Sequence, residues 1–155
     1  MIVSDDIIHI SKRFSEFTKT FEDEIDKELL AVCEKLVYYD EKGLIDNQFL
    51  KEISEKTGIS EFYITNSDGV TIYSNNPMGI GFKFTDDKST QAYEFYEILT
   101  DSNKKVCQEM KIRDIDGKYF KFAAVSKKSS KGIIQAGLDL EDLHRFRGQY
   151  AMDIK

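Results

Sequence analysis

The chain has 155 residues and a mass of 17.9 kDa, and 41% of its residues are hydrophobic, including 11 Phe and 8 Tyr. This aromatic content excludes a disordered tail, and the single proline and two cysteines exclude a Pro-rich or disulfide-stapled chain. The formal net charge of −6 argues against a nucleic-acid partner, because such a partner requires a basic face. We expect one globular domain over residues 1–155, and no apolar run is long enough to predict a membrane span or a signal peptide.

The charge is unevenly distributed along the chain. Residues 1–58 hold 14 acidic and 8 basic residues, which accounts for the whole −6, and residues 59–155 hold 14 of each. Within this neutral part, residues 104–131 carry nine Lys or Arg against three Asp or Glu, a local excess of +6. Most of these lysines fall at predicted turns and edges, where lysine discourages strand-to-strand aggregation.

The first predicted element is a long helix over residues 1–42. Apolar residues recur in steps of three and four from Phe14 onward, and no Gly or Pro interrupts the run before Gly43. About 30 helical residues would span about 45 Å, which is longer than the core of a small domain requires. We expect the excess, around Phe14, Phe17 and Phe21, to pair in parallel with the same helix of a second copy, which predicts a homodimer.

After this helix the pattern changes in two steps. Asp46 as N-cap and Gly58 as stop predict a short second helix, and from residue 59 short extended runs alternate with turns. A polar C-terminal segment, residues 141–155, predicts a connecting helix that runs out of the domain. Between these helices, strands are predicted at 61–65, 70–74, 106–113, 119–126 and 132–140, and a short helix at 90–99.

The short connections between these strands predict an antiparallel sheet. Strand 119–126 is apolar at both odd and even positions, so both faces of the sheet must be covered, one of them by the long helix. We therefore predict an α+β fold, with the sheet and a pocket formed by residues 59–140.

Four blocks of sequence follow one another within residues 64–138. They are ITNSDGVTIYSN at 64–75, IGFKF at 80–84, DGKYFKFAAV at 116–125 and GIIQAGL at 132–138. In order and spacing, and together with the preceding helix, they resemble the Cache sensor domains, the PAS-like modules of methyl-accepting chemotaxis receptors and sensor histidine kinases. The resemblance implies an antiparallel sheet of five or six strands with the long helix on one face. It also implies a small ligand pocket between the other face and segment 75–99.

The resemblance further implies a non-enzymatic ligand-sensing domain of a bacterial receptor. Such a domain lies on the extracytoplasmic side of the membrane, with the membrane spans in flanking segments, and a cytoplasmic sensor domain is the alternative. The functional alternative is a PAS-like dimerisation module without a ligand. Tyr73 matches the Tyr of the amino-acid-binding members, but the loop after it has no Arg and the chain has no Trp, so the ligand stays open.

Five residues are candidates for the ligand site: Tyr73, Tyr93, Tyr96, Arg113 and Lys121. The local positive excess favours an anionic ligand, so we expect a small carboxylate-bearing molecule paired with Arg113 or Lys121. A tyrosine hydroxyl would supply a neutral contact.

No metal, cofactor or catalytic group is predicted. His9 and His144 lie at opposite ends of the chain, and Cys33 and Cys107 lack the spacing of a metal or redox motif. The sequence also assembles no nucleophile with a base and an orienting group.

Overall fold

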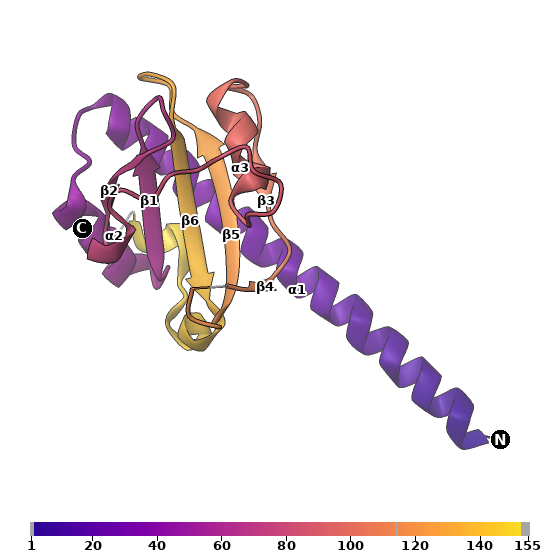
Figure 1. Ribbon diagram of the computed structural model, residues 1–155. Helices are drawn as coiled ribbons and strands as arrows, with labels where there is room; N and C mark the ends of the chain where they lie inside the picture. Colours follow the sequence, from indigo (N-terminus) through magenta and orange to yellow (C-terminus); the bar gives the residue numbers. More distant parts are fainter. Residues whose placement is uncertain (1, 114, 153–155) are drawn as a thin grey trace.

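The computed structural model describes residues 2–113 and 115–152, and it places an antiparallel sheet between α1 on one face and a shorter covering segment on the other (Figure 1). This confirms the predicted α+β fold, with six strands and the long helix on one face. The helices are α1 (Ile2–Glu41), α2 (Asn47–Thr57), η1 (Pro77–Gly79), α3 (Tyr93–Tyr96), η2 (Glu97–Leu99), η3 (Leu140–Arg145) and η4 (Gly148–Met152), where η marks 3₁₀-helices. The strands are β1 (Glu61–Thr65), β2 (Thr71–Ser74), β3 (Val106–Cys107), β4 (Lys111–Ile112), β5 (Tyr119–Ser126) and β6 (Ile133–Asp139).

The strands lie in the order β2-β1-β6-β5-β3, and β4 also pairs with β5. The first and last strands in sequence, β1 and β6, are therefore neighbours in the middle of the sheet. Their register sets Glu61 opposite Gly137 and Ile64 opposite Ile134. Pairing of distant strands at the centre means that the sheet is complete only when the whole of residues 61–139 has folded.

The predicted strand 106–113 is divided into β3 and β4. Gln108 still donates its N–H to the carbonyl of Phe122 on β5, at 3.0 Å. The N–H of Met110 instead donates to the Glu22 side chain on α1, at 3.2 Å. A backbone group that bonds to the helix leaves the ladder with β5, which explains why one predicted strand became two.

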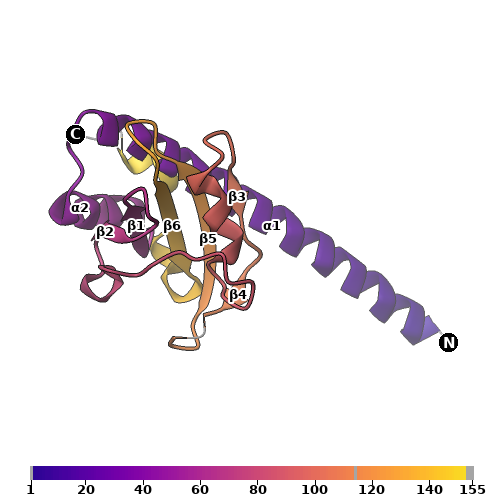
Figure 2. The same cartoon turned by 45° about the horizontal axis from the view of Figure 1, so that its top comes forward.

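Alternation along β5 separates the two faces of the sheet. Ala123 and Val125 belong to the core beneath α1, whereas Phe120, Phe122 and Ala124 belong to a second core on the opposite face. The sheet is thus the middle of three layers (Figure 2).

Helix α1 has two parts with different surroundings. From Ile25 to Val37 its apolar residues are buried against β5 and β6. Nearer the N-terminus, residues 7–21 project beyond the sheet (Figure 1), and Phe14 and Phe17 are 70% and 68% exposed. Met1, which the predicted helix included, lies outside the described residues.

The second helix has the predicted caps. The carboxylate of Asp46 accepts a hydrogen bond from the N–H of Phe49 at 2.7 Å, and Gly58 ends the helix at φ 76°. A side chain at Gly58 would also collide with the chain at Arg145, since a Cβ would lie 1.9 Å from the Arg145 carbonyl oxygen.

The C-terminal segment differs from the predicted connecting helix over 141–155. Residues 140–152 form two 3₁₀-helices, interrupted near Gly148 at φ 71°. They return to the domain, where η4 packs against α1 and α2 and Met152 joins the core beneath α1. Burial of the apolar residues at this end stabilises the protein more than a longer polar helix would. Residues 153–155 of the predicted helix lie outside the described residues.

Within residues 2–113 and 115–152, no helix is both long enough and apolar enough to cross a membrane.

Candidate functional site

The face of the sheet opposite α1 is covered by residues 75–99, as the resemblance implied. Aromatic side chains fill the space between this cover and the sheet. Phe84 and Phe95 pack edge to face with ring centroids 6.4 Å apart, Phe95 contacts Phe122 at 6.5 Å, and Phe122 stacks on Phe120 at 5.1 Å. The centre of this face is therefore an apolar core, and the polar groups lie at its margins.

Arg113, which follows β4, is the centre of a polar cluster at one margin. Its Nη1 lies 3.0 Å from the Glu61 Oε1, and its Nε and Nη2 lie 3.1 and 2.5 Å from the two carboxylate oxygens of Asp116. The guanidinium carbon is 3.9 Å from the centroid of the Phe120 ring. Because the Arg113 side chain is only 15% exposed, its charge is balanced mainly inside the protein, by two carboxylates and an aromatic face.

Glu61 on β1 joins this cluster to the loop after β2. Its Oε1 accepts hydrogen bonds from the Tyr63 hydroxyl, from the Asn76 side chain at 3.2 Å and from Arg113. Burial, followed by the neighbouring Glu61 charge, raises the pKa of Tyr63, so its hydroxyl keeps its proton and remains a donor. Three donors that converge on one carboxylate oxygen form the arrangement with which proteins recognise a carboxylate.

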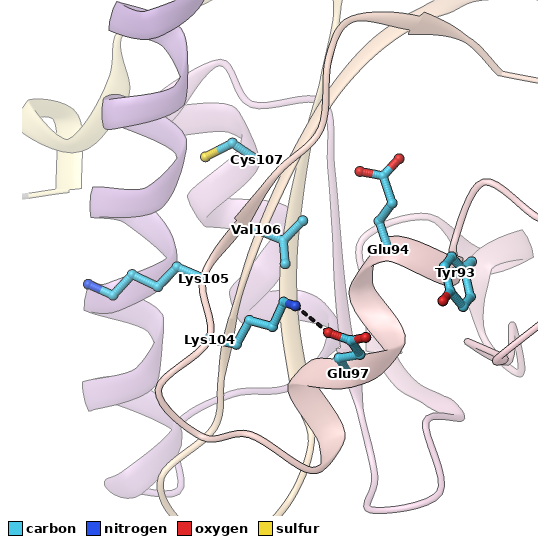
Figure 3. Close-up of a pocket in the computed structure, with 7 residues that line it drawn as sticks. All are labelled: Tyr93, Glu94, Glu97, Lys104, Lys105, Val106 and Cys107. Carbon is cyan, nitrogen blue, oxygen red and sulfur yellow. Dashed lines mark hydrogen bonds and ion pairs between the residues drawn. The ribbon is translucent and has the colours of Figure 1, made fainter. Parts of the chain in front are cut away.

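A first surface hollow of about 360 Å³ lies between α3, η2 and β3 (Figure 3). Its residues are Tyr93, Glu94, Glu97, Lys104, Lys105, Val106 and Cys107. Lys104 is paired with Glu97, and Lys105 extends toward α1, where it pairs with Glu34. Its charges are thus already matched within the protein.

A second hollow of about 410 Å³ lies at the end of the sheet where the β1–β2 and β5–β6 turns approach η2. It combines Lys83 and Lys131 with the hydroxyl groups of Ser67, Tyr96 and Thr100. It is also open to solvent, and Asp68 at its rim offsets part of the positive charge.

The structure divides the five predicted ligand residues between the two faces of the sheet. Arg113, Tyr93 and Tyr96 lie on the face that residues 75–99 cover. Tyr73 on β2 is paired with Ile64 and packs against the core beneath α1. Lys121 on β5 also faces α1 and is 3% exposed, with its Nζ 2.6 Å from the Gln108 carbonyl oxygen. The five residues therefore cannot contact one small ligand together.

Sequence reasoning missed the partners of Arg113. Glu61 is 52 residues away and Asn76 enters from a different loop, so no local spacing signals their contact. Asp116 at the third position after Arg113 was the one local signal, because Asp116-Gly117 is a turn that can return a carboxylate toward the preceding residue.

Among the residues that the structure describes, no three or more His, Cys, Asp or Glu side chains are grouped so that they could hold a metal ion.

Comparison with solved structures identifies the fold. The sensor domain of the V. cholerae histidine kinase DctB matches 91% of this chain with a TM-score of 0.54 and 19% sequence identity, and the chain spans 58% of that domain. The ligand-binding domain of Mlp24 with asparagine matches 52% of this chain and 28% of its own length, at 26% identity, but its TM-score of 0.30 is too low to support an argument. No model of a known family and no curated protein matches the sequence. The DctB likeness confirms the fold that the resemblance implied, an antiparallel sheet with the long helix on one face.

Proposed function

We propose that this chain is a ligand-sensing domain of a signal-transduction receptor, either a histidine kinase or a chemoreceptor, and that it has no enzymatic activity. The observation that supports this function is the fold, which the chain shares over 91% of its length with the sensor domain of a histidine kinase. By the same analogy, the domain lies on the extracytoplasmic side of a membrane receptor, and a cytoplasmic sensor is the alternative.

Helix α1 is the element that would carry the signal. On strand β5, the Phe122 side chain packs in the covered face and the Ala123 side chain packs in the core beneath α1. A shift in the packing of the covered face would therefore be passed to α1 through this one strand. A ligand that binds one arrangement of cover, sheet and helix more tightly shifts the population toward that arrangement. The exposed end of α1 then transmits the shift to a second copy or to the next domain.

The proposed ligand is a small carboxylate-bearing molecule held by Arg113. Tyr93 and Tyr96 lie on the same face but line two separate hollows, neither of which includes Arg113, so they would not share its ligand. Asp116 is the more exposed of the two carboxylates on Arg113, at 31% against 14% for Glu61. A ligand carboxylate that replaces Asp116 would keep the bidentate geometry and release Asp116 to water. Lys121 and Tyr73 are assigned instead to the contact between sheet and helix.

A thermal-shift screen of the full chain against organic acids, amino acids and amines tests this function. A binding acid at one hundred times its Kd adds about 2.7 kcal/mol to the free energy of unfolding, and the increase follows the ligand concentration. Arg113→Gln should abolish the shift, whereas Lys118→Gln, a neighbouring lysine that is 47% exposed, should retain it. Circular dichroism verifies that both variants are folded.

The second candidate function is a dimerisation module without a ligand. The aromatic packing of the covered face favours it, because Phe84, Phe95 and Phe122 occupy the space that a ligand would need. No thermal shift with any compound class, in a chain that is dimeric, would support this alternative. A shift that Arg113→Gln leaves unchanged would support sensing but reject the carboxylate site.

The proposed dimer contact is the projecting part of α1. Ile7, Ile10, Phe14, Phe17 and Phe21 are exposed and alternate in steps of three and four, which is the spacing of a coiled-coil seam. The flanking positions in a parallel pair carry Ser11, Arg13, Thr18 and Thr20, so like charges do not oppose one another. A second copy presents the same stripe and is therefore its matching partner.

A further inference from the structure

The second hollow, at the end of the sheet, holds positive charge that the protein does not neutralise by ion pairing. Lys83 and Lys131 both line it, and neither forms an ion pair with a carboxylate among the residues that the structure describes. The lysines of the first hollow differ, because Lys104 and Lys105 are each paired with a glutamate. Two lysines without ion-pair partners on the walls of one hollow create a potential that attracts an anion.

The wall that carries Lys83 is fixed by backbone contacts. Val70 and Lys83 form an antiparallel bridge, and the N–H of Phe84 donates to the carbonyl of Gly69 at 2.9 Å. Gly69 has a φ of 80°, and a Cβ at this position would lie 3.0 Å from the Leu99 Cδ1 and 3.1 Å from the Phe84 carbonyl oxygen. The β1–β2 turn, the covering segment and η2 are therefore packed closely together, so this wall of the hollow is formed before any ligand binds.

Two hydroxyl groups in the same hollow are also free to bind a ligand. Ser67 and Tyr96 both line it, and neither hydroxyl has a hydrogen-bond partner within the described part of the chain. Val70 and Leu99 add apolar surface beside these polar groups. The hollow thus combines cations, hydroxyl donors and apolar side chains in a volume of about 410 Å³, which is within the range of small-molecule sites.

The charges of the hollow favour a phosphate monoester over a carboxylate. A carboxylate is planar and is matched best by the planar fork of an arginine, whereas the lysine ammonium is a point charge that binds phosphate well. A phosphate monoester carries about −1.5 to −2 charges at pH 7 and has three strong acceptor oxygens, so two lysines and two hydroxyl groups complement it. The Asp68 carboxylate at the rim would repel any anion and should weaken the binding.

We propose that the second hollow binds a small phosphate monoester, with its phosphate group held by Lys83 and Lys131 and its organic part against Leu99. Two flexible lysine side chains on the walls of one hollow can reach one phosphate group. The site goes beyond the proposed sensing function, because the hollow does not include Arg113 and requires no carboxylate ligand. A bound phosphate would connect the covering segment, which carries Lys83, to the β5–β6 turn, which carries Lys131.

The test titrates the ¹⁵N-labelled full chain with phenyl phosphate and, separately, with benzoate, which has the same ring and a carboxylate. The amide signals are followed by NMR at about pH 7.5 in about 0.1 M NaCl, which screens weak attraction between exposed charges. Phenyl phosphate should cause saturable shifts at residues 67–70, at Lys83 and at Lys131. The Kd of benzoate for the same site should be at least about tenfold higher, because it carries one charge instead of nearly two.

Substitutions assign the binding to this hollow. Lys83→Gln and Lys131→Gln should each raise the Kd of phenyl phosphate about tenfold, because each removes one charged contact. Asp68→Asn should lower the Kd, since it removes the repelling charge. Lys128→Gln is the matched control, because Lys128 is exposed in the same β5–β6 turn but does not line the hollow. The amide spectra of the free variants verify that each one is folded.

Arg113→Gln separates this site from the proposed sensing site, and it should leave the Kd of phenyl phosphate unchanged. Binding that is lost in Arg113→Gln but retained in Lys83→Gln and Lys131→Gln would assign the phosphate to the Arg113 cluster and overturn the proposal. Shifts that grow linearly and spread over the other exposed lysines would overturn it as well, since they report charge attraction without a site. The same holds if Lys128→Gln weakens binding as much as Lys131→Gln, or if benzoate binds as tightly as phenyl phosphate.

Discussion

Lys121 of β5 and Asp26 of α1 form an ion pair across the interface between sheet and helix, with the Lys121 Nζ 3.0 Å from the Asp26 Oδ1. A second pair, Lys127 with Asp40, joins the residue that follows β5 to a later turn of α1, with the Lys127 Nζ 3.9 Å from the Asp40 Oδ1. The six residue steps from Lys121 to Lys127 span about 20 Å of extended chain, and the fourteen steps from Asp26 to Asp40 span about 21 Å of helix. The two pairs therefore match and define the register of α1 on β5.

We predict that Lys121→Met destabilises the domain by about 3 kcal/mol, because it leaves the Asp26 carboxylate in the interface without its cation. Urea denaturation measures this change. The double variant Lys121→Met/Asp26→Leu should recover at least half of the loss. Lys104→Met, which removes a surface pair with Glu97, should leave the unfolding curve nearly unchanged. Equal losses for the two lysine variants would contradict the assigned role of Lys121.

Cys107 should react slowly with iodoacetamide despite its exposure. Burial of the thiol, together with the nearby Asp26 charge, raises the pKa of Cys107 from 9.0 to about 11. Alkylation requires the thiolate, so the rate at pH 8 should be about a hundredfold below that of an unperturbed thiol and should rise with pH up to about 11. The measurement uses Cys33→Ala, in which Cys107 is the single cysteine. Adding Asp26→Asn should lower the pKa and accelerate alkylation, and an unchanged rate would exclude the Asp26 contribution.

Gly137→Ala should destabilise the domain by about 1–3 kcal/mol through overpacking of the covered face. A Cβ at this position would lie 2.5 Å from the Phe122 Cε1 and 3.2 Å from the Phe120 Cδ2. The change is measured by thermal or urea unfolding. If the aromatic rings cause the strain, the double variant Gly137→Ala/Phe122→Leu will lose less stability than the two single variants together. Strict additivity would show that the strain arises elsewhere.

Phe17→Asp should convert the proposed dimer to a monomer, because it places a charge within the apolar stripe of α1. Analytical ultracentrifugation gives the molecular mass, and circular dichroism checks that the core, which does not include Phe17, stays folded. Met78→Asp is the matched control, since Met78 is 87% exposed but lies in the loop after β2. If the unsubstituted chain is already a monomer, the proposed dimer contact along α1 is wrong.

The elements that have local signals could be predicted from the sequence. The cap of α2 at Asp46 and its end at Gly58 depend on contacts within four residues, and the turn at Asn66 depends on its own side chain bonding to the N–H groups of Asp68 and Val70. The short connections between strands predicted an antiparallel sheet, and the resemblance of the sequence blocks to the Cache domains implied that the sheet is PAS-like with the long helix on one face.

Which side chains share a face, and which distant residues are in contact, depends on how the layers pack. Both faces of β5 are apolar, so the residue pattern of this strand does not predict which face packs against α1. The structure shows that Lys121 faces α1, whereas Phe120 and Phe122 face the covering segment. The Arg113–Glu61 pair joins residues 52 positions apart, through a sheet in which the order of the strands differs from their order in the chain. The C-terminal segment turned back for a similar reason, since Met152 finds an apolar surface between α1 and α2 that exists only after those helices have packed. Such contacts depend on the assembled layers, and no spacing along the chain encodes them.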